Sequence, residues 1–391
     1  MPSELRGQTE KNHTVFNPSR SRSWKWPQHE WGGLLDPFHF NRKQLRWKIE
    51  YGDGSEAEGI TGFDTIKFGE VEIEGQAVQL AKSYHGNQFK TGSADGVLGL
   101  AFGHLNSVQP GPVKTPLETM IEQNLIREKL FTVNLNHGRE SFFTFGYVDE
   151  EARAGRDVHW VDVDSRGGFW NFNSRYAKVG NKYLRRRGGA AIADTGSSLI
   201  LTHPHISYMI YDRIEGAKWD PRQPGWIYPK TAKVPEVAFS VGDDTRCMIV
   251  INELNMRHVD LGHGYYFGAI QDNPLYDSGG PQFDVFGTPF LKQVYALFDV
   301  DKERFGVIKK ELDEMAPIIE AARQMDSEEQ ARGIESSPDG SILEDRFPRR
   351  QSTLKSIVEM NSLLPEDDIY GARVLHQEPE DISGKGKERA E

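Results

Sequence analysis

Alternation of apolar and polar residues with a period of two dominates residues 1–310 of this chain. The clearest runs are rich in Val, Phe and other aromatic residues, are bounded by Gly, Asp, Asn or Pro, and occupy residues 45–50, 131–135, 141–145, 234–240 and 296–300. This pattern predicts short β-strands joined by tight turns, for which the 39 glycines of the chain are well suited.

Two segments show instead the spacing of an amphipathic helix. Residues 115–127 have Pro116 near their start, and residues 205–216 end at Gly216, a common stop signal. Their apolar faces are formed by Leu117, Met120, Ile121 and Leu125 in the first segment and by Ile206, Met209, Ile210 and Ile214 in the second. Many short strands with two short helices predict an all-β protein of two similar lobes.

Charge is distributed unevenly along the chain. The formal net charge is −11, and residues 311–391 contain 20 acidic against 10 basic residues, with Phe347 and Tyr370 as their only aromatic residues. This composition offers too little apolar surface to offset chain entropy, so residues 311–391 are predicted to be a disordered acidic tail. The overall acidity disfavours a nucleic-acid partner.

Several further classes are disfavoured by what the sequence does not contain. There is no run of about 18 apolar residues, so no transmembrane helix is predicted. Residues 1–30 are polar and basic, without the apolar region of a signal peptide. The single Cys247 excludes an intrachain disulfide and a Cys-cluster zinc site, and is interpreted as a buried small hydrophobe. No P-loop, dinucleotide fingerprint or metal motif occurs, so neither a cofactor nor a metal is predicted.

The most informative stretch is residues 190–201, in which small apolar residues lead into Asp194-Thr195-Gly196 and an apolar run leaves it. Asp-Thr-Gly alone is a weak signal, but the flanking strands and the serines that follow strengthen it. The alternative is a hairpin turn with a solvated aspartate. The three arginines directly before this stretch, Arg185, Arg186 and Arg187, are predicted to lie on a solvated hairpin.

Together with five other segments in the same order, this motif resembles the pepsin family of aspartic peptidases, most of all its secreted fungal aspergillopepsin and endothiapepsin branch. The other matching segments are residues 51–55, 63–66, 95–102, 267–271 and 285–287. The resemblance spans residues 14 to about 308 and implies a bilobal all-β fold with a substrate cleft between the lobes. A disulfide of the fungal relatives would join the positions held here by Lys230 and Tyr266.

The resemblance implies an endopeptidase that cuts extended peptides or unfolded protein segments at acidic pH, without a cofactor. Two neighbouring carboxylates would share one proton, so that the ionised one activates a water and the protonated one binds the scissile carbonyl. The implied site consists of the catalytic Asp194, the loop residues Thr195, Gly196 and Ser197, and the flap residues Tyr51, Gly52 and Asp53.

The family places a second Asp-Thr-Gly in the first lobe, and no such motif stands there in this sequence. Asp194 precedes Gly287 by 93 residues, and counting 93 back from Gly99 reaches Arg6 rather than an aspartate. The chain is therefore expected to begin just after the first active-site loop. This expectation divides it into an incomplete N-terminal lobe with the flap (residues 1–150), a C-terminal lobe (151–310) and the tail (311–391). The other carboxylates weighed as substitutes, and interpreted as turn or surface groups, are Asp36, Asp53, Asp64 and Asp277.

Three functions stay open at this point. The first is an active aspartic endopeptidase, the second a pseudo-peptidase that binds peptides without cutting them, and the third an incomplete gene model of an active secreted enzyme. Residues 352–364 of the tail carry an apolar stripe, which is interpreted either as a weak docking segment or as a transient helix without a partner. Asn12 begins a glycosylation sequon that matters only if the chain enters the secretory route.

Overall fold

A computed structural model describes residues 15–27, 45–51, 55–85, 95–137, 139–276, 282–310, 324 and 373–375 of the 391-residue chain. These residues form predominantly β-structure arranged in sheets of three, eleven, four and four strands. The all-β fold class is therefore confirmed. The docking segment 352–364 and Asn12 lie outside these ranges. Of the predicted disordered tail, residues 311–391, only residue 324 and residues 373–375 are described, and the latter form a short strand that pairs with residues 142–144. The rest of the tail prediction falls on residues that the structure does not describe.

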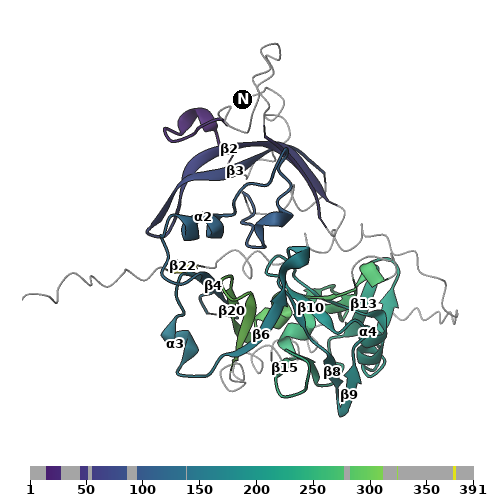
Figure 1. The fold of residues 1–391 in the computed structure, drawn as a ribbon. Coiled ribbons are helices and arrows are strands. Elements are labelled where there is room, and N and C mark those ends of the chain that lie inside the picture. The colour runs from purple at the N-terminus through teal and green to yellow at the C-terminus, as the bar shows by residue number, and fades with distance from the viewer. Residues whose placement is uncertain are drawn as a thin grey trace, which may run out of the picture.

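The three-stranded sheet is antiparallel and contains β1 (Arg46–Glu50), β2 (Glu56–Phe68) and β3 (Val71–His85). In Figure 1 the long β2–β3 pair lies at the top of the molecule, above α2 (Pro116–Glu122). Val71 and Ile73 of β3 share a core cluster with Leu117 and Met120 of α2. The helix therefore closes the apolar face of this sheet.

The eleven-stranded sheet forms the centre of the molecule (Figure 1). Its strands, in spatial order, are β18 (Ile270–Asp272), β11 (Ile200–Thr202), β19 (Asp284–Phe286), β10 (Ala190–Ala193), β7 (Asn171–Asn173), β6 (His159–Asp164), β21 (Arg304–Lys309), β20 (Val294–Asp299), β4 (Leu130–Asn134), β5 (Phe142–Phe145) and β22 (Arg373–Leu375). Phe131 of β4 and Phe298 of β20 stack with their ring centroids 4.4 Å apart, and Trp170 meets Phe298 edge-on at 5.1 Å. Segments far apart in the sequence are thus held together by one aromatic core.

The two four-stranded sheets flank the C-terminal part of this central sheet. Their strands are β12 (Lys218–Asp220), β13 (Gly225–Pro229), β17 (Tyr265–Gly268) and β16 (Arg257–Asp260) in one, and β15 (Met248–Ile251), β14 (Val237–Ser240), β8 (Tyr176–Val179) and β9 (Lys182–Arg185) in the other. Lys230 and Tyr266, the positions that correspond to the fungal disulfide, lie close together, with the ammonium 5.4 Å from the ring centroid. A cation–π contact occupies the place of the covalent link.

Both predicted helices exist but are shorter than the sequence suggested. In α2 the Thr115 hydroxyl accepts the Glu118 amide at 3.2 Å, and the Glu118 carboxylate accepts the Thr115 amide at 2.8 Å, which completes a capping box. The helix ends at Glu122 rather than 127, because Asn124 adopts a left-handed conformation with φ of 55°. The second helix, α4, spans Pro204–Tyr211 and gives way to turns before Gly216.

The other helical elements with bounds inside the described ranges are short and were not predicted. They are α3 (Glu150–Arg153), α5 (Thr288–Leu291) and the single-turn 3-10 helices η2 (Pro18–Arg20), η3 (Gly103–Leu105), η4 (Ser165–Gly167), η5 (Leu254–Met256) and η6 (Pro274–Tyr276). Among the described residues, no helix has the length and apolar character needed to cross a membrane. Cys247 is buried with a free thiol, as its interpretation as a small hydrophobe requires.

Candidate active site

Asp194 stands in the turn that joins β10, which is labelled in Figure 1, to β11. The two strands do not pair with each other, because β19 lies between them, parallel to β10 and antiparallel to β11. The register sets Ile192 opposite Val285 and Ile200 opposite Phe286. The turn with Asp194 therefore crosses over the end of β19, where Gly287 follows.

Three backbone hydrogen bonds fix this turn to the end of β19. The Asp194 amide donates to the Phe286 carbonyl at 3.1 Å, and the Gly287 amide donates to the Leu199 carbonyl at 3.1 Å. The Thr288 amide donates to the Ser197 carbonyl at 2.8 Å. Because these bonds involve the main chain on both sides, the position of Asp194 is defined by backbone geometry rather than by one flexible side chain.

Position 287 requires glycine because the Asp194 turn leaves no room for a side chain there. A Cβ atom at this position would lie 2.2 Å from the carbonyl oxygen of Ser197 and 2.3 Å from that of Leu199. Its φ of −83° is accessible to any residue, so conformational freedom is not the reason. The apolar-apolar-Gly pattern at residues 285–287 thus has a physical basis, since only glycine lets the Asp194 turn approach so closely.

The Asp194 carboxylate is partly buried, and its Oδ1 atom accepts the Gly196 amide at 2.9 Å. Burial raises the pKa of this carboxyl, and the hydrogen bond from Gly196 offsets only part of the rise. The Ser197 hydroxyl donates to the Leu199 carbonyl at 3.1 Å and so stiffens the far side of the turn. Thr195 is partly buried beside it. The four residues predicted for this loop thus lie together, and their roles stay predictions.

A buried ion pair lies in the structure that supports this turn. Arg186, just before β10, pairs with Asp284, the first residue of β19, and both side chains are only 1% exposed. Asp284 also accepts hydrogen bonds from the hydroxyls of Thr202 and Tyr276, the latter at 2.7 Å. The expectation that Arg186 lies on a solvated hairpin is therefore wrong. Its neighbours Arg185 and Arg187 are exposed as expected.

Only the base of the predicted flap hairpin lies within the described residues. β1 and β2 pair in an antiparallel register that ends with Glu50 opposite Glu56, and the Tyr51 amide donates to the Ser55 carbonyl at 2.8 Å. This pairing is that of a hairpin closed by a short loop. Gly52 and Asp53 lie outside the described residues, so the role of residues 51–53 as a flap stays a prediction.

A second carboxylate does not contact Asp194 within the described ranges. Asp64 is only 4% exposed and accepts hydrogen bonds from Ser21 at 2.9 Å, Ser23 at 2.5 Å and the Thr65 amide at 2.9 Å. Burial opposes its ionisation, but these hydrogen bonds prevail and lower its pKa. Asp64 thus anchors residues 15–27 to β2. Asp36, Asp53 and Asp277 lie outside the described residues.

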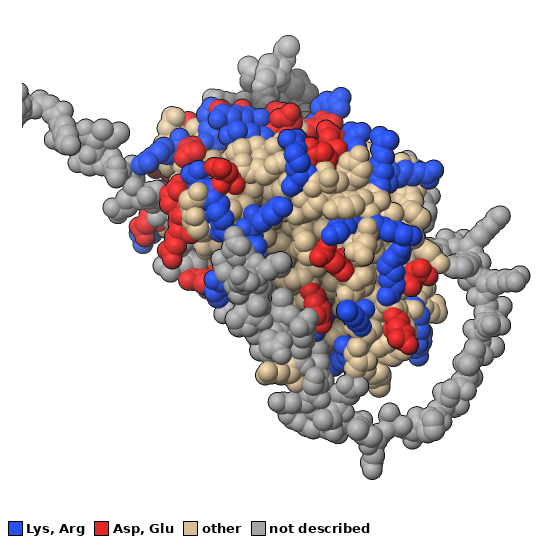
Figure 2. Space-filling view, turned by 90° about the horizontal axis from the view of Figure 1, so that it is seen from below, with Lys and Arg blue, Asp and Glu red and all other residues tan. Residues whose placement is uncertain are grey.

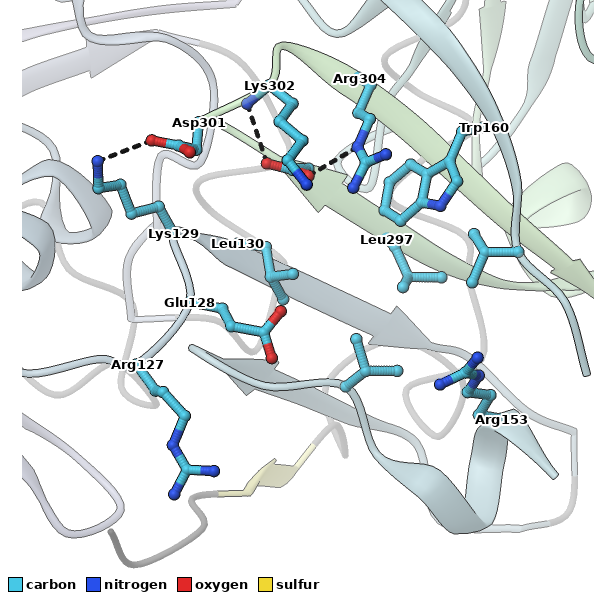
Figure 3. Close-up of a pocket in the computed structure, with 13 residues that line it drawn as sticks. Arg127, Glu128, Lys129, Leu130, Arg153, Trp160, Leu297, Asp301, Lys302 and Arg304 are labelled. Carbon is cyan, nitrogen blue, oxygen red and sulfur yellow. Dashed lines mark hydrogen bonds and ion pairs between the residues drawn. The ribbon is translucent and has the colours of Figure 1, made fainter. Parts of the chain in front are cut away.

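The structure also has a surface hollow of about 420 Å³, formed over β4, β20, β21 and β6 (Figure 3). Figure 3 shows Glu128, Leu130 and Leu297 around it, with Arg304 over the ring of Trp160 at 3.8 Å from the centroid. Arg304 also pairs with Asp299 at 2.7 Å. None of the predicted site residues lines this hollow, so it is separate from the Asp194 turn.

Basic and acidic side chains are interspersed on the face drawn in Figure 2, which therefore shows no continuous basic surface. Some exposed charges of the described residues are paired, as in Lys129–Asp301 and Arg175–Asp243, both at 2.7 Å. Across the described ranges there is no group of three or more His, Cys, Asp or Glu side chains placed to hold a metal ion.

Comparison with known proteins identifies the family to which this chain is similar. A sequence model of the family described as eukaryotic aspartyl protease matches residues 39–310. Aspergillopepsin-1 of Aspergillus oryzae is 34% identical over 260 residues, which cover 66% of this chain and 64% of the relative. Aspergillopepsin-1 of Aspergillus clavatus is 33% identical over 303 residues, covering 78% and 70%. Penicillopepsin-1 of Penicillium rubens is 34% identical over 265 residues, covering 66% and 63%.

The chain spans about 64% of the length of the first curated relatives that it matches. The family match itself covers well over half of this chain and includes both the Asp194 turn and the strand β19 that holds it. The chain belongs to the eukaryotic aspartyl protease family, with fungal aspergillopepsins and penicillopepsin among its relatives.

Proposed function

We propose that this protein is a pepsin-like aspartic endopeptidase in which Asp194 is one of two catalytic carboxylates. The observation that carries the proposal is the backbone clamp on the Asp194 turn, in which β19 and Gly287 fix the carboxylate at the end of two buried strands. A catalytic group must be held in one geometry, and a turn bonded on both sides provides that. The fungal relatives named above carry peptidase names, which supports the same assignment.

The raised pKa of Asp194 suits the chemistry proposed for it. A carboxyl group that holds its proton to higher pH can donate a hydrogen bond to a peptide carbonyl while a partner carboxylate, still ionised, takes a proton from water. Burial provides this shift without any neighbouring charge. The substrate class proposed is an extended peptide, covered by the hairpin that carries Tyr51, and the setting proposed is acidic and extracellular.

A peptide-binding homologue that does not hydrolyse is the second candidate. It is favoured by one specific observation, namely that no carboxylate of the described residues contacts Asp194. One aspartate can act as acid or as base, but a single concerted step needs both roles at once. Loss of one positioned proton-transfer group costs a factor of about 10²–10⁴ in rate.

A fluorescence-quenched peptide assay on the full chain between pH 3 and 5 tests the two candidates. The variants are Asp194→Asn and, as a matched control, Asp157→Asn, which changes an exposed aspartate. Cleavage that is lost in Asp194→Asn and kept in Asp157→Asn supports the peptidase. Saturable binding of an extended peptide without cleavage, measured by fluorescence anisotropy, supports the second candidate. A chain that neither binds nor cuts extended peptides would contradict both.

A further inference from the structure

The hollow over β4, β20, β21 and β6 has more basic than acidic side chains around it. Five Lys or Arg residues line it, against three Asp or Glu residues (Figure 3). Arg304 pairs with Asp299 and Lys129 pairs with Asp301, both at 2.7 Å, so these four charges are balanced. The hollow thus differs from the chain as a whole, whose formal net charge is −11.

Two basic side chains of the hollow have no acidic partner. Arg127 and Lys302 are exposed, and neither side chain forms an ion pair with any residue that the structure describes. The bond drawn from Lys302 in Figure 3 comes from its main-chain nitrogen, which donates to Asp299 at 3.0 Å. Among the described residues that line the hollow, Glu128 is the one carboxylate without a partner. The unpaired charge of the lining is therefore positive.

The floor of the hollow is apolar. Leu130 and Leu297 are 5% and 0% exposed, and Leu297 belongs to a cluster with Val158 and Trp160 on this face of the central sheet. The volume of about 420 Å³ lies within the range of ligand sites in proteins. An occupant would thus meet an apolar floor and positive charges at the rim, which suits an acidic segment with an apolar side chain.

Strand β22 brings the acidic tail to one edge of this sheet. It is parallel to β5, and the register sets Leu375 opposite Thr144. From Thr144, β5 leads on to Gly146, whose amide donates to the Leu130 carbonyl at 2.9 Å and whose carbonyl accepts the Glu128 amide at 3.0 Å. Because parallel strands run in the same direction, the chain leaves β22 toward the end of the sheet where the hollow lies.

We propose that the hollow is a docking site for residues 376–382 of the same chain, which directly follow β22. This segment contains Glu378, Glu380, Asp381 and Ile382, and no Lys or Arg. β22 lies two strands away from β4, which corresponds to about 10 Å, and an extended chain advances about 3.3 Å per residue. Three or four residues are therefore long enough to reach the hollow from β22.

Charge and connectivity select this segment over other occupants. Its three carboxylates match the unpaired Arg127 and Lys302, and Ile382 suits the apolar floor. The tail also follows β21, but Arg304 at the start of that strand lines the hollow and Lys309 at its end does not. Because β22 holds residues 376–382 beside the hollow, their docking is intramolecular and is favoured over that of a separate acidic peptide.

Zero-length carbodiimide coupling of the full chain tests the docking directly, because this reagent joins a carboxylate only to an amine that it contacts. Mass spectrometry of a digest is expected to show Lys302 or Lys129 linked to residues 378–381. Lys182, an exposed amine of β9 in a different sheet, is the matched control and should form no such link. Coupling that appears only in a covalent dimer would overturn docking within one chain.

Hydrogen–deuterium exchange measures how firmly the segment is held. Lys302→Glu and Arg127→Glu should each speed exchange at residues 376–382 by roughly fivefold, because the new carboxylate repels the acidic segment. Both side chains are exposed and unpaired, so the melting temperature should match that of the parent. Lys182→Glu reverses an exposed charge outside the hollow and should leave the exchange unchanged.

The tail offers an independent variant. Glu378→Gln, Glu380→Gln and Asp381→Asn together remove its three charges and should speed exchange at residues 376–382 as the hollow variants do. About 0.5 M sodium chloride should have the same effect on the parent, since salt screens exposed charges. Exchange that none of these changes affects, or the absence of any link from Lys302 and Lys129 to residues 378–381, would overturn the docking site. None of these measurements depends on peptide hydrolysis.

Discussion

Arg186 and Asp284 form an ion pair that is almost completely removed from solvent, and it joins the segment before β10 to the first residue of β19. These are the two parallel strands at whose ends Asp194 and Gly287 lie. The guanidinium also donates to the backbone carbonyl and the hydroxyl of Ser174. A charge buried in this way depends on its partner, so the pair links the stability of the fold to the geometry of the site.

Replacement of Arg186 by Met is expected to lower the free energy of unfolding by about 3–5 kcal/mol, because the Asp284 carboxylate would remain buried without its counter-charge. Urea denaturation at pH 7 measures the effect. The exposed neighbours offer matched controls, and Arg185→Met and Arg187→Met should each stay within about 0.5 kcal/mol of the parent. If all three variants lose the same stability, the ion pair is not what holds these strands.

The features that the sequence predicted correctly depend on residues close together in the chain. Period-two alternation predicted strands such as β1 and β14, since side-chain direction in a strand alternates by residue. The Asp194 motif was identifiable because its flanking apolar runs are contiguous with it. Arg186 was predicted wrongly, because its burial depends on Asp284, a partner far away in the sequence that no local pattern reveals.

The sequence also did not predict where helices end or which apolar segments are exposed. The apolar face over residues 115–127 continues past the real end of α2, and the left-handed Asn124 that ends the helix carries no apolar signal. The apolar-apolar-Gly patterns at residues 97–99 and 285–287 look alike in sequence, yet Phe286 is buried and Leu98 is exposed. Whether such a pattern is buried depends on its tertiary neighbours, not on the pattern itself.

Gly287→Ala is expected to displace the Asp194 turn, because the new Cβ would stand 2.2 Å from the Ser197 carbonyl oxygen. Overpacking of this kind costs about 1–3 kcal/mol. Hydrogen–deuterium exchange should quicken at the amides of Asp194 and Thr288, which lose good geometry when the turn moves. Gly99→Ala is the matched control, since nothing lies within 4 Å of its Cβ position. Unchanged exchange at Asp194 in Gly287→Ala would contradict the steric argument.

Asp194→Asn is expected to stabilise the fold at neutral pH. Burial raises the folded-state pKa of Asp194 above its unfolded value of about 3.9, so ionisation at pH 7 opposes folding. The folded state keeps the proton more strongly, and stability therefore increases as pH falls through the folded-state pKa. An amide keeps the hydrogen bond from Gly196 and carries no charge.

Thermal melts from pH 7 to pH 3 should show this difference directly. Asp194→Asn should melt above the parent at pH 7, and the gap should close as the pH approaches 3, where the parent carboxyl is also neutral. Asp157→Asn, at an exposed aspartate, should follow the parent throughout. A gap that stays constant with pH would show that the variant acts through packing rather than ionisation.

His258 should give the opposite pH dependence. Burial lowers its pKa to about 4, assisted by the positive charge of Lys292, and its Nε2 atom has no hydrogen-bond partner in the described structure. Between pH 6.5, the usual pKa of a histidine, and about pH 4, the side chain of His258 binds a proton in the unfolded chain but stays neutral in the folded chain. Stability should therefore fall by up to about 1.4 kcal/mol for each pH unit across this window.

His258→Gln should flatten that slope, because a neutral amide has no proton to gain, whereas His205→Gln at an exposed position should leave it unchanged. Urea denaturation at pH 7, 5.5 and 4 provides the comparison, and a slope in His258→Gln identical to that of the parent would show that His258 is not responsible. The two buried groups then act in opposite directions on acidification. Protonation of the unfolded chain at His258 destabilises the fold, whereas protonation of the folded chain at Asp194 stabilises it as the pH falls through the raised pKa of this carboxyl.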